Sequence, residues 1–583
     1  MRSKLIQSLL ASVLAAGACS SAHAQLTQLN YFNANQGSGL SAGEIVAFDK
    51  VTDRLFVTSS GNGAQATGVH QVNIFEFTTP GSQTSGGVID YSTAFGAKVD
   101  MRGLSSVAVD PLNRFGVVSL IPTANATTLG KVGFFNLSTG ASLGTVDVGY
   151  HPDSVTFSTD GSKLIVVNEG EFNPNLNLSD GTIYTGTNTG NVNAPGSISI
   201  IDVSGITSGN LASLTGLAVT TKDFSAENLA SGVSIAALRN SNVSTVGTTG
   251  TFIGTVPVFN TADIGAIEPE YASVKGDKVY VSLQDNNAIA EYDLTSGKWT
   301  EVKSLGTIAQ TIDATDTGST TSISQVVKGL PMPDTVATFV SGGKTYVVSA
   351  NEGDARVDDR DMSRFGDVSG SDSMNPILDA KYPTTATGVR DVAELGRLNV
   401  SRLDGDTNGD GLIDDPTMIG TRSFSIYEKT EGGLVRVYDS GSFFETYIAA
   451  NGGWQDSRSD DKGPEPEGLT IGEINGRTYL FIGMERTAHI FQFDITNPLG
   501  VTFVDAELLP FADAQRPEGF LFISAADSPN GQNLLVVGYE GAGSSTTEKI
   551  GVFTVIPEPS AYAAIAGGVL FGFAALRRRR ARA

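Results

Sequence analysis

The sequence predicts an all-β protein, a β-propeller of about seven blades with two long insertions. Three observations lead to this prediction. Short runs of β-branched and aromatic residues are separated by turns rich in Gly, Asn, Asp and Ser, a composition typical of strands and hairpins. These runs recur in seven segments that share one plan. Between the two ends of the chain, apolar runs long enough for helices are scarce.

Each segment has a strand-like run, a turn, a second apolar run that ends in polar residues, and a third run. Seven antiparallel sheets in series fit a propeller, in which radial packing protects the sheet edges. Two separate β domains are the alternative. Two intervals are too long for a four-stranded blade, so we place insertions near residues 172–265 and 354–422 of a body that spans 25–555. The segments begin near residues 45, 106, 152, 269, 333, 466 and 517.

The composition excludes several classes of protein. The chain has 583 residues, with 62 acidic and 38 basic side chains and a net charge of −24, which disfavours nucleic acid or an anionic membrane as a partner. Only 17% of the residues are charged and 40% are hydrophobic, so a disordered polyelectrolyte is excluded. With Cys19 as its one cysteine, the chain can form neither an intrachain disulfide nor a cysteine-based zinc site.

The first 24 residues have the pattern of a secretory signal peptide. Arg2 and Lys4 precede an apolar run, and Ala22-His23-Ala24 supplies the small residues of a signal-peptidase site, so Gln25 is the expected new N-terminus. The alternative is a lipoprotein with Cys19 as the lipidated residue. Residues 16–18 lack the large aliphatic side chain expected before such a cysteine.

Residues 556–583 have three parts: the motif Pro557-Glu558-Pro559, an uncharged stretch over 560–576 and the basic cluster Arg577–Arg580. As a transmembrane helix, the stretch would span roughly 25 Å, with the basic cluster on the cytoplasmic side. This tail resembles the PEP-CTERM sorting signal of Gram-negative bacteria. The resemblance implies an exosortase-type enzyme as processing partner and membrane contact only through the tail, before its removal. A permanent single-span anchor is the alternative.

Carboxylates flank the strands of five segments in a regular way. One precedes the first strand and one follows the second strand. Because neighbouring strands of a blade are antiparallel, both positions lie at the same end of the sheet. We therefore expect up to ten carboxylates to gather on one face of the propeller. They are Asp153, Glu270, Asp334, Glu467 and Glu518 before the first strands, and Glu169, Asp285, Glu352, Glu485 and Glu540 after the second strands.

Several long motifs resemble the choice-of-anchor I family. The resemblance covers roughly residues 150–555, and it implies an exported bacterial protein with a propeller-like body and one of several alternative C-terminal sorting tails. It does not imply a particular activity. The motifs are Val167-Asn168-Glu169-Gly170-Glu171, Ile267-Glu268-Pro269-Glu270-Tyr271, Ser282-Leu283-Gln284-Asp285-Asn286-Asn287-Ala288, Ala350-Asn351-Glu352-Gly353-Asp354-Ala355-Arg356, Arg422-Ser423-Phe424-Ser425-Ile426, the stretch from Arg458 to Gly468, and Pro517-Glu518-Gly519.

The strongest local metal motif is an acidic, Gly-rich loop. Read from Asp406, oxygen-bearing side chains occupy loop positions 1, 3, 5 and 9, and Gly411 takes the tight-turn position, as in calcium loops. Position 12 is Thr417 in place of the bidentate glutamate, and an ordinary acidic surface loop is the alternative. The predicted Ca²⁺ ligands are Asp406, Asn408, Asp410, the Leu412 carbonyl and Asp414.

Catalytic residues remain unknown from the sequence, and the candidates lie in the acidic set: Glu467, Glu518, Glu352 and Glu169. A cation bound there could polarise a phosphate, and clustered carboxylates raise one another's pKa, which suits acid–base work. The alternative is structural: the carboxylates cap turns and pair with nearby arginines. Those arginines are Arg356, Arg458, Arg486 and Arg516.

The function that the sequence favours is an exported propeller, at the cell surface or in the extracellular matrix of a Gram-negative bacterium, that is stabilised by calcium and binds an unknown surface or matrix ligand. The second hypothesis is a calcium-dependent phosphoesterase-type hydrolase that uses the acidic face. The third is a purely structural matrix component. Whether the protein is an enzyme stays open at this point.

Overall fold

The structure is a computed structural model. The predicted signal peptide, residues 1–24, and the predicted sorting tail from residue 557 onward lie outside the residues that it describes. Those residues are 25–34, 41–60, 69–124, 127–170, 194–207, 210–211, 214, 216–236, 238–239, 243–244, 258–259, 264, 267–317, 321–354, 362–369, 373–375, 377–510, 514–541 and 548–556.

Within these residues, seven antiparallel sheets have four or five strands each. The first contains β2 (Ser41–Asp49), β3 (Arg54–Ser60), β4 (Gln71–Glu76) and β5 (Thr84–Asp90). The second contains β6 (Met101–Gly103), β7 (Val107–Val109), β8 (Gly116–Pro122), β9 (Lys131–Phe135) and β10 (Ser142–Asp147). The third contains β11 (Pro152–Phe157), β12 (Lys163–Asn168), β13 (Ser197–Asp202) and β14 (Val219–Asp223).

The fourth sheet contains β17 (Ala272–Lys275), β18 (Lys278–Leu283), β19 (Ala288–Asp293) and β20 (Lys298–Ser304). The fifth contains β23 (Val336–Ser341), β24 (Lys344–Asn351), β28 (Ser423–Thr430) and β29 (Gly433–Asp439). The sixth contains β30 (Pro466–Ile474), β31 (Arg477–Met484), β32 (His489–Asp494) and β33 (Thr502–Leu508). The seventh contains β34 (Pro517–Ile523), β35 (Leu534–Tyr539), β36 (Lys549–Ile556) and β1 (Gln25–Asn33).

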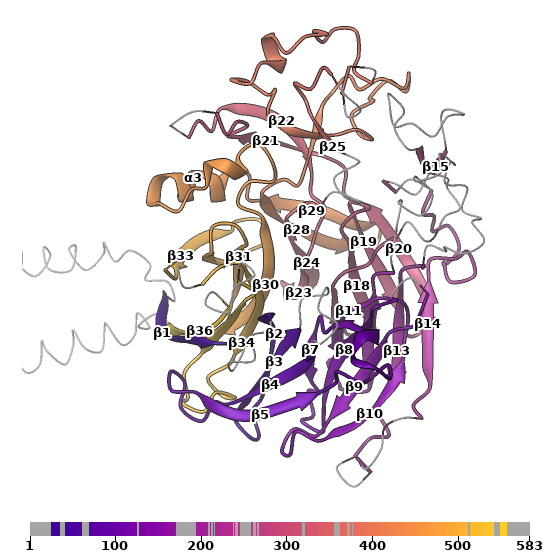
Figure 1. Ribbon diagram of the computed structural model, residues 1–583, viewed down its shortest axis with the longest axis vertical. Coiled ribbons are helices and arrows are strands. Elements are labelled where there is room, and N and C mark those ends of the chain that lie inside the picture. Colours follow the sequence, from indigo (N-terminus) through magenta and orange to yellow (C-terminus); the bar gives the residue numbers. More distant parts are fainter. Residues whose placement is uncertain are drawn as a thin grey trace, which may run out of the picture.

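The sheets are arranged around a common axis (Figure 1). One strand of each sheet contacts the corresponding strand of the next sheet, in the order β2, β7, β11, β17, β23, β30 and β34, and β34 contacts β2 again. A closed ring of inner strands is the defining feature of a propeller. The prediction of an all-β propeller is therefore confirmed, and the alternative of two separate β domains is wrong.

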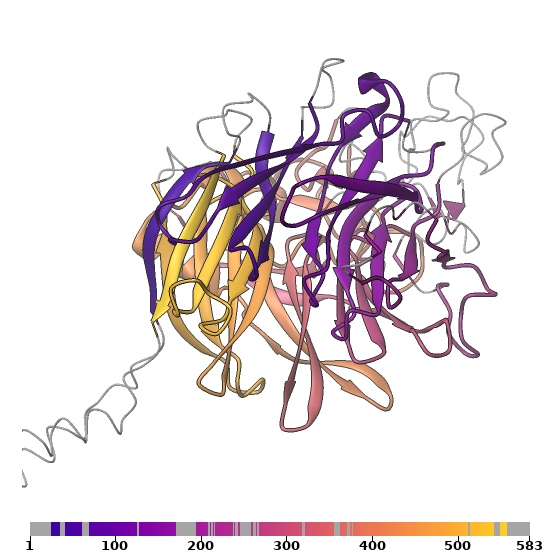
Figure 2. The ribbon, with the colours of Figure 1, turned by 90° about the horizontal axis from the view of Figure 1, so that it is seen from below.

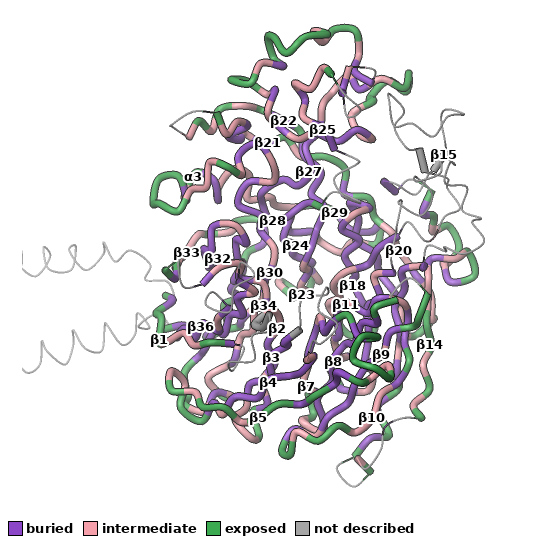
Figure 3. The backbone as a smooth tube through the Cα atoms, in the orientation of Figure 1, coloured by how far each residue is buried: buried purple, intermediate pink, exposed green. Residues whose placement is uncertain are grey.

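The core lies between successive sheets, where their faces pack together (Figure 3). The second strands, such as β8 and β35, are buried along their whole length, and they consist largely of Val, Leu and Ile. Such near-continuous apolar strands are expected when both faces of a sheet are covered. Aromatic rings also pack between neighbouring sheets. The ring centroids of Phe424 in β28 and Phe493 in β32 lie 4.8 Å apart.

The N-terminal strand completes the last sheet. β1 pairs antiparallel with β36, in a register that sets Gln25 opposite Ile556, so the first and last described residues of the body are neighbours. Figure 2 shows β1 beside the yellow C-terminal strands. Leu26 is buried in the apolar core between the sixth and seventh sheets, and its backbone N–H donates to Asp505 Oδ2 at 3.0 Å. The seventh sheet thus joins the first and last strands of the described body.

The two ranges predicted to be insertions have different outcomes. Strands β13 and β14 lie within 172–265 yet belong to the third sheet, so that range is not an insertion throughout. A long connection after β12 separates the strands of one sheet, which the sequence spacing could not distinguish from an inserted unit. The short strands β15 (Val243–Ser244) and β16 (Val258–Phe259) also fall there.

The range 354–422 falls between β24 and β28 of the fifth sheet and forms a separate layer at the top of Figure 1. One small sheet pairs β21 (Ile308–Ile312) with β22 (Gln325–Leu330) and β22 with β27 (Thr417–Ile419). A second pairs β25 (Met362–Arg364) with β26 (Asn399–Ser401). Helix α3 (Phe443–Asn451) and three 3-10 turns, Lys98–Asp100, Gly388–Arg390 and Asp456–Arg458, complete the described elements.

A buried ion pair connects this layer to the propeller. Arg422 and Glu445 are each 1% exposed, and their side chains meet at 2.5 Å between Nη1 and Oε1. Arg422 also donates to the carbonyls of Asp313, Ser459 and Asp461. One guanidinium therefore fixes β28, helix α3 and the segment that leads into β30.

We expect Leu26→Ala to lower the free energy of unfolding by about 3 kcal/mol, because it leaves a cavity where β1 closes the ring. Leu29→Ala on the same strand is the matched control. Leu29 is 40% exposed, so its truncation should change stability by less than about 0.5 kcal/mol. Urea unfolding of both variants measures the difference, and equal losses would contradict a closing role for β1.

Candidate functional site

The candidate site is the set of acidic side chains at one end of the inner strands. We call this set the acidic face. Several of the carboxylates predicted before the first strands and after the second strands repel one another across the ring. Glu518 of the seventh sheet interacts with Glu44, Asp334 and Asp153 of three other sheets, and Glu467 interacts with Glu352 and Asp334. The expectation that these positions share one face therefore agrees with the geometry.

Two residues of this acidic face were not predicted from the sequence. Glu44 of β2 occupies the same position in the first sheet, and its pKa is raised by burial and then by Glu540 and Asp153. Its place in the first segment was a signal that could have identified it. Tyr271 follows Glu270, and its hydroxyl lies 3.5 Å from Glu518 Oε1. In the second sheet serines replace the carboxylate, and Ser105 Oγ donates to the carbonyl of Pro152.

The repeated Pro-Glu-Gly sequence explains how the face is assembled. A Cβ atom on Gly468 would lie 1.7 Å from the carbonyl oxygen of Glu518, and one on Gly519 would lie 2.1 Å from that of Glu44. Only glycine allows the backbones of neighbouring inner strands to approach so closely. Each glycine directly follows a glutamate, so this contact brings Glu467, Glu518 and Glu44 to successive places around the axis.

Two groups of three carboxylates are close enough to hold a metal ion. The first acidic cluster is Asp153, Glu169 and Glu270, and the second acidic cluster is Glu352, Glu467 and Glu485. In each cluster, one oxygen from every residue lies within 4.8 Å of the other two. Hard oxygen ligands at such spacing suit Ca²⁺ or Mg²⁺. Three of the four catalytic candidates, Glu169, Glu352 and Glu467, belong to these clusters.

Burial and mutual repulsion raise the pKa values of seven carboxyl groups on this face. Burial and then Glu169 raise the pKa of Asp153 to about 7, and burial, Glu465 and Glu352 raise that of Glu485 to about 8. Five further carboxyl groups have pKa values raised well above the ordinary range, with burial as the largest cause. They are Glu44, Glu270, Asp334, Glu467 and Glu518.

Basic side chains contact two members of the second cluster. Lys462 Nζ lies 3.0 Å from Glu352 Oε1, and Arg486 Nη1 lies 2.8 Å from Glu485 Oε1. Both also contact Glu465, which is fully buried. Although burial favours the neutral acid, Lys462 and Arg486 lower the pKa of Glu465 to about 2. Glu465 therefore acts as the shared counter-ion of these bases.

The alternative in which arginines neutralise the carboxylates applies to part of the face. Arg516 pairs with Glu485 and Glu540, whereas Arg458 pairs with Asp461 and Glu465. Arg356 lies outside the described residues. Among the residues that the structure describes, no lysine or arginine pairs with Glu467, and one of its oxygens is enclosed without a hydrogen-bond partner. Turn capping and ion pairing therefore leave Glu467 unexplained.

The predicted calcium loop lies in the inserted layer, away from the inner strands. The carboxylate of Asp406 accepts the N–H groups of Gly409 and Gly411 at 2.7 and 2.8 Å. Asp410 accepts the N–H of Leu412 at 2.9 Å, and Asp414 accepts that of Thr407 at 3.1 Å. Backbone donors thus order the loop. Within the described residues, the groups of three acidic ligands are the two clusters on the propeller, not this loop.

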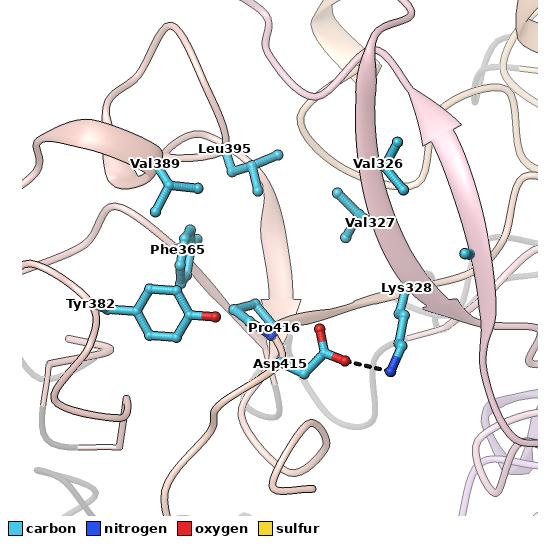
Figure 4. Close-up of a pocket in the computed structure, with 10 residues that line it drawn as sticks. Val326, Val327, Lys328, Phe365, Tyr382, Val389, Leu395, Asp415 and Pro416 are labelled. Carbon is cyan, nitrogen blue, oxygen red and sulfur yellow. Dashed lines mark ion pairs between the residues drawn. The ribbon is translucent and has the colours of Figure 1, made fainter.

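A cavity of about 320 Å³ lies between β22 and the inserted layer (Figure 4). Val326 and Val327 line one side, Phe365 and Tyr382 line another, and Lys328 pairs with a carboxylate at its edge. Its lining comes from segments far apart in the sequence and carries no spaced motif, so sequence reasoning missed it. Its lining residues include none of the acidic face.

A comparison with known families shows the family to which this chain belongs. Residues 44–498, more than half of the chain, match the choice-of-anchor I domain. The chain belongs to the choice-of-anchor I domain family. Among the described residues, no helix combines the length and apolar character needed to cross a membrane. The predicted helix over residues 560–576 lies outside them.

Two curated relatives of this family member come from animals. Gigasin-3a of Magallana gigas is 30% identical over 202 residues, covering 29% of this chain and 69% of that protein. The mesenchyme-specific cell surface glycoprotein of Strongylocentrotus purpuratus is 26% identical over 207 residues. That match covers 29% of this chain and only 26% of the glycoprotein.

The solved structures similar to this family member share little sequence with it. Hydrazine synthase of Kuenenia stuttgartiensis is 12% identical with a TM-score of 0.40, and the match covers 90% of this chain and 99% of that one. The periplasmic gluconolactonase PpgL of Pseudomonas aeruginosa is 10% identical, with a TM-score of 0.38 and coverages of 80% and 85%. The Dos1 propeller is 9% identical, with a TM-score of 0.38 and coverages of 91% and 96%.

We expect the cation-free protein to lose stability as the pH rises from about 4 to about 8. The pKa of Asp153 rises from 3.8 to about 7 on folding, and that of Glu485 from 4.5 to about 8. In this window the folded state binds more protons than the unfolded state, so the free energy of unfolding falls with rising pH. Melting curves in chelator at about pH 5 and about pH 8 measure the effect. Asp153→Asn should flatten the dependence, and a steeper or unchanged slope would contradict it.

Proposed function

We propose that the chain is an exported, surface-associated propeller of seven blades that binds divalent cations at its acidic face. The seven sheets and the closed ring of inner strands support the blade number. Membership in the choice-of-anchor I domain family and the name of the sea urchin relative, a cell surface glycoprotein, support the location. A bacterial surface or matrix ligand would then be held at or beside the bound cation.

One observation carries the cation site. Glu352, Glu467 and Glu485 bring three carboxylate oxygens within 4.8 Å of one another, and one oxygen of Glu467 is enclosed without a partner. Like charges at this distance repel strongly, and Glu467, which has no basic partner among the described residues, must take a proton or share a cation. A Ca²⁺ ion uses several such oxygens at once. Binding is the function that this arrangement supports best.

A second candidate function is a calcium-dependent phosphoesterase-type hydrolase. The observation that favours it is that three of its catalytic candidates, Glu169, Glu352 and Glu467, lie in clusters whose oxygens are close enough to hold a cation. A bound cation would polarise a phosphate oxygen. Glu467, Glu518, Glu352 and Glu169 remain the catalytic candidates of this hypothesis.

We also propose that the loop in the inserted layer holds a stabilising Ca²⁺ through Asp406, Asn408, Asp410, the Leu412 carbonyl and Asp414. The ordered turns around Asp406 and Asp410 support this proposal, because backbone donors already fix the carboxylates. An ion there would stabilise the fold and take no part in chemistry.

Calcium should raise the melting temperature of the protein. An ion that binds only the folded state stabilises it by about 2.7 kcal/mol at a concentration a hundredfold above its Kd. Glu467→Gln should remove the part of this shift that comes from the second acidic cluster, and Asp410→Ala the part that comes from the loop. Glu473→Gln, on the exposed side of the same strand as Glu467, is the matched control and should change nothing.

The comparison is made by melting curves in Ca²⁺ and in EDTA. Equal melting temperatures in both solutions would contradict calcium binding at either place. A phosphoester substrate panel run on the same samples separates the two functions. Turnover that EDTA and Glu467→Gln abolish would favour the hydrolase over the binding module.

Export and processing form the last part of the proposal. An exosortase-type enzyme would cut at the Pro557-Glu558-Pro559 motif, and the pairing of Gln25 with Ile556 is compatible with processing on both sides of the body. Mass spectrometry of the native protein should find Gln25 at the start and no peptide from 561–576. Peptides from that range in mature surface material would instead show a retained anchor.

A further inference from the structure

The cavity between β22 and the inserted layer has an apolar rim. Val326 is 69% exposed and Val389 is 39% exposed, and both side chains line the cavity. Exposed apolar side chains that gather at one hollow gain free energy when a ligand removes them from water. The cavity volume of about 320 Å³ is at the lower end of the range for small-molecule sites. A ligand of the size of one amino acid therefore suits it better than an oligosaccharide or a long acyl chain.

The aromatic wall of the cavity is held in place from behind. Phe365 is completely buried, and its ring packs edge-to-face on that of Tyr382 with the ring centroids 5.3 Å apart. The guanidinium of Arg390 lies 5.6 Å from the centre of the Phe365 ring, and its Nε donates to the Phe365 carbonyl at 2.7 Å. The Tyr382 hydroxyl donates to the carbonyl of Asp414 at 3.0 Å. The wall is thus formed before a ligand arrives, which lowers the entropic cost of binding.

The other end of the cavity carries one charge of each sign. Lys328 Nζ pairs with Asp415 Oδ2, and the two side chains are 45% and 37% exposed, so a ligand can reach both charges. Figure 4 shows this pair at the far end of the cavity from Val389 and Leu395. A ligand with a single ionic group would be attracted by one member of the pair and repelled by the other. A zwitterion that lies antiparallel to the pair is attracted by both members and leaves the pair intact.

We propose that this cavity binds a free hydrophobic α-amino acid. Its side chain packs against Phe365 and the valines, its carboxylate faces Lys328 and its ammonium faces Asp415. An amino acid zwitterion has no net charge, so the net charge of −24 on the chain does not repel it. The cavity shares no residue with the acidic face, and the inference therefore goes beyond the proposed cation-binding function and does not depend on it.

Calorimetric titration with L-phenylalanine tests the proposal, in EDTA so that bound cations do not contribute. We expect saturable binding of one molecule per chain. Phenethylamine lacks the carboxylate and hydrocinnamate lacks the ammonium, and each should bind about fivefold more weakly, because an exposed ion pair contributes up to about 1 kcal/mol. L-Serine keeps both charges but has no apolar side chain, and it should give no measurable heat of binding.

Two variants match the charged groups of the ligand to their partners. In Lys328→Met, phenethylamine should bind at least as tightly as L-phenylalanine, because the partner of the carboxylate is gone. In Asp415→Asn, hydrocinnamate should bind at least as tightly as L-phenylalanine, because the partner of the ammonium is gone. Lys344→Met is the control: it removes a lysine that pairs with Glu428 in the fifth sheet, and it should leave all three affinities unchanged.

A third variant fills the cavity. Ala309 lines it and is exposed, so Ala309→Trp can place a large side chain there without disturbing the core, and it should abolish binding. Val340→Trp, at a position of β23 that is 42% exposed and outside the cavity, is the control and should bind normally. If Ala309→Trp does not fold, as judged by its circular dichroism, the ligand series and the two charge variants still decide.

The outcomes separate this inference from the cation-binding function. Absence of L-phenylalanine binding to the unmutated protein, or binding that a folded Ala309→Trp leaves unchanged, would overturn the site. Equal affinities for L-phenylalanine, phenethylamine and hydrocinnamate would overturn the assignment of a zwitterion. Absence of Ca²⁺ binding would overturn the proposed cation sites and leave this inference standing.

Discussion

Closure of the ring is the constraint on which the rest of this structure depends. A sheet left incomplete at the junction would expose unpaired strand edges and the apolar core between the sixth and seventh sheets. The N-terminal strand β1 prevents this by pairing with β36, and Leu26 fills the adjacent core. Closure also determines how near the inner strands come to one another. It therefore sets the distances between the carboxylates at the beginning of these strands.

The acidic face is a consequence of that closeness. Where Gly468 and Gly519 allow the backbones to meet, the glutamates before them have no room to separate. Burial and mutual repulsion then act in the same direction, and both favour the neutral acid. Tight packing of the ring therefore destabilises the ionised carboxylates at its axis. Protons, the bases around Glu465 or bound cations offset this destabilisation.

Much of this architecture could be predicted from the sequence. Repeated short strands predict the sheets, and the parity of antiparallel strands is sufficient to place Glu467 at the same end of its sheet as Glu485, and Asp153 at the same end as Glu169. Glu44 follows the same rule but was missed, because its sequence context differs from the Pro-Glu and Pro-Asp motifs of the other sheets. The position of β13 and β14 could not be predicted, since a long connection inside a sheet has the same spacing as an insertion.

The grouping of the carboxylates was beyond sequence reasoning for a different reason. Strand parity gives the end of the sheet at which a side chain lies, but the distance between sheets depends on packing around the whole ring. Glu270 joins Asp153 and Glu169 although it belongs to the next sheet, and Glu352 joins Glu467 and Glu485 in the same way. Both clusters therefore bridge neighbouring sheets. A cation held at either one would tie two sheets together, so that binding at the axis and stability of the ring are parts of the same equilibrium.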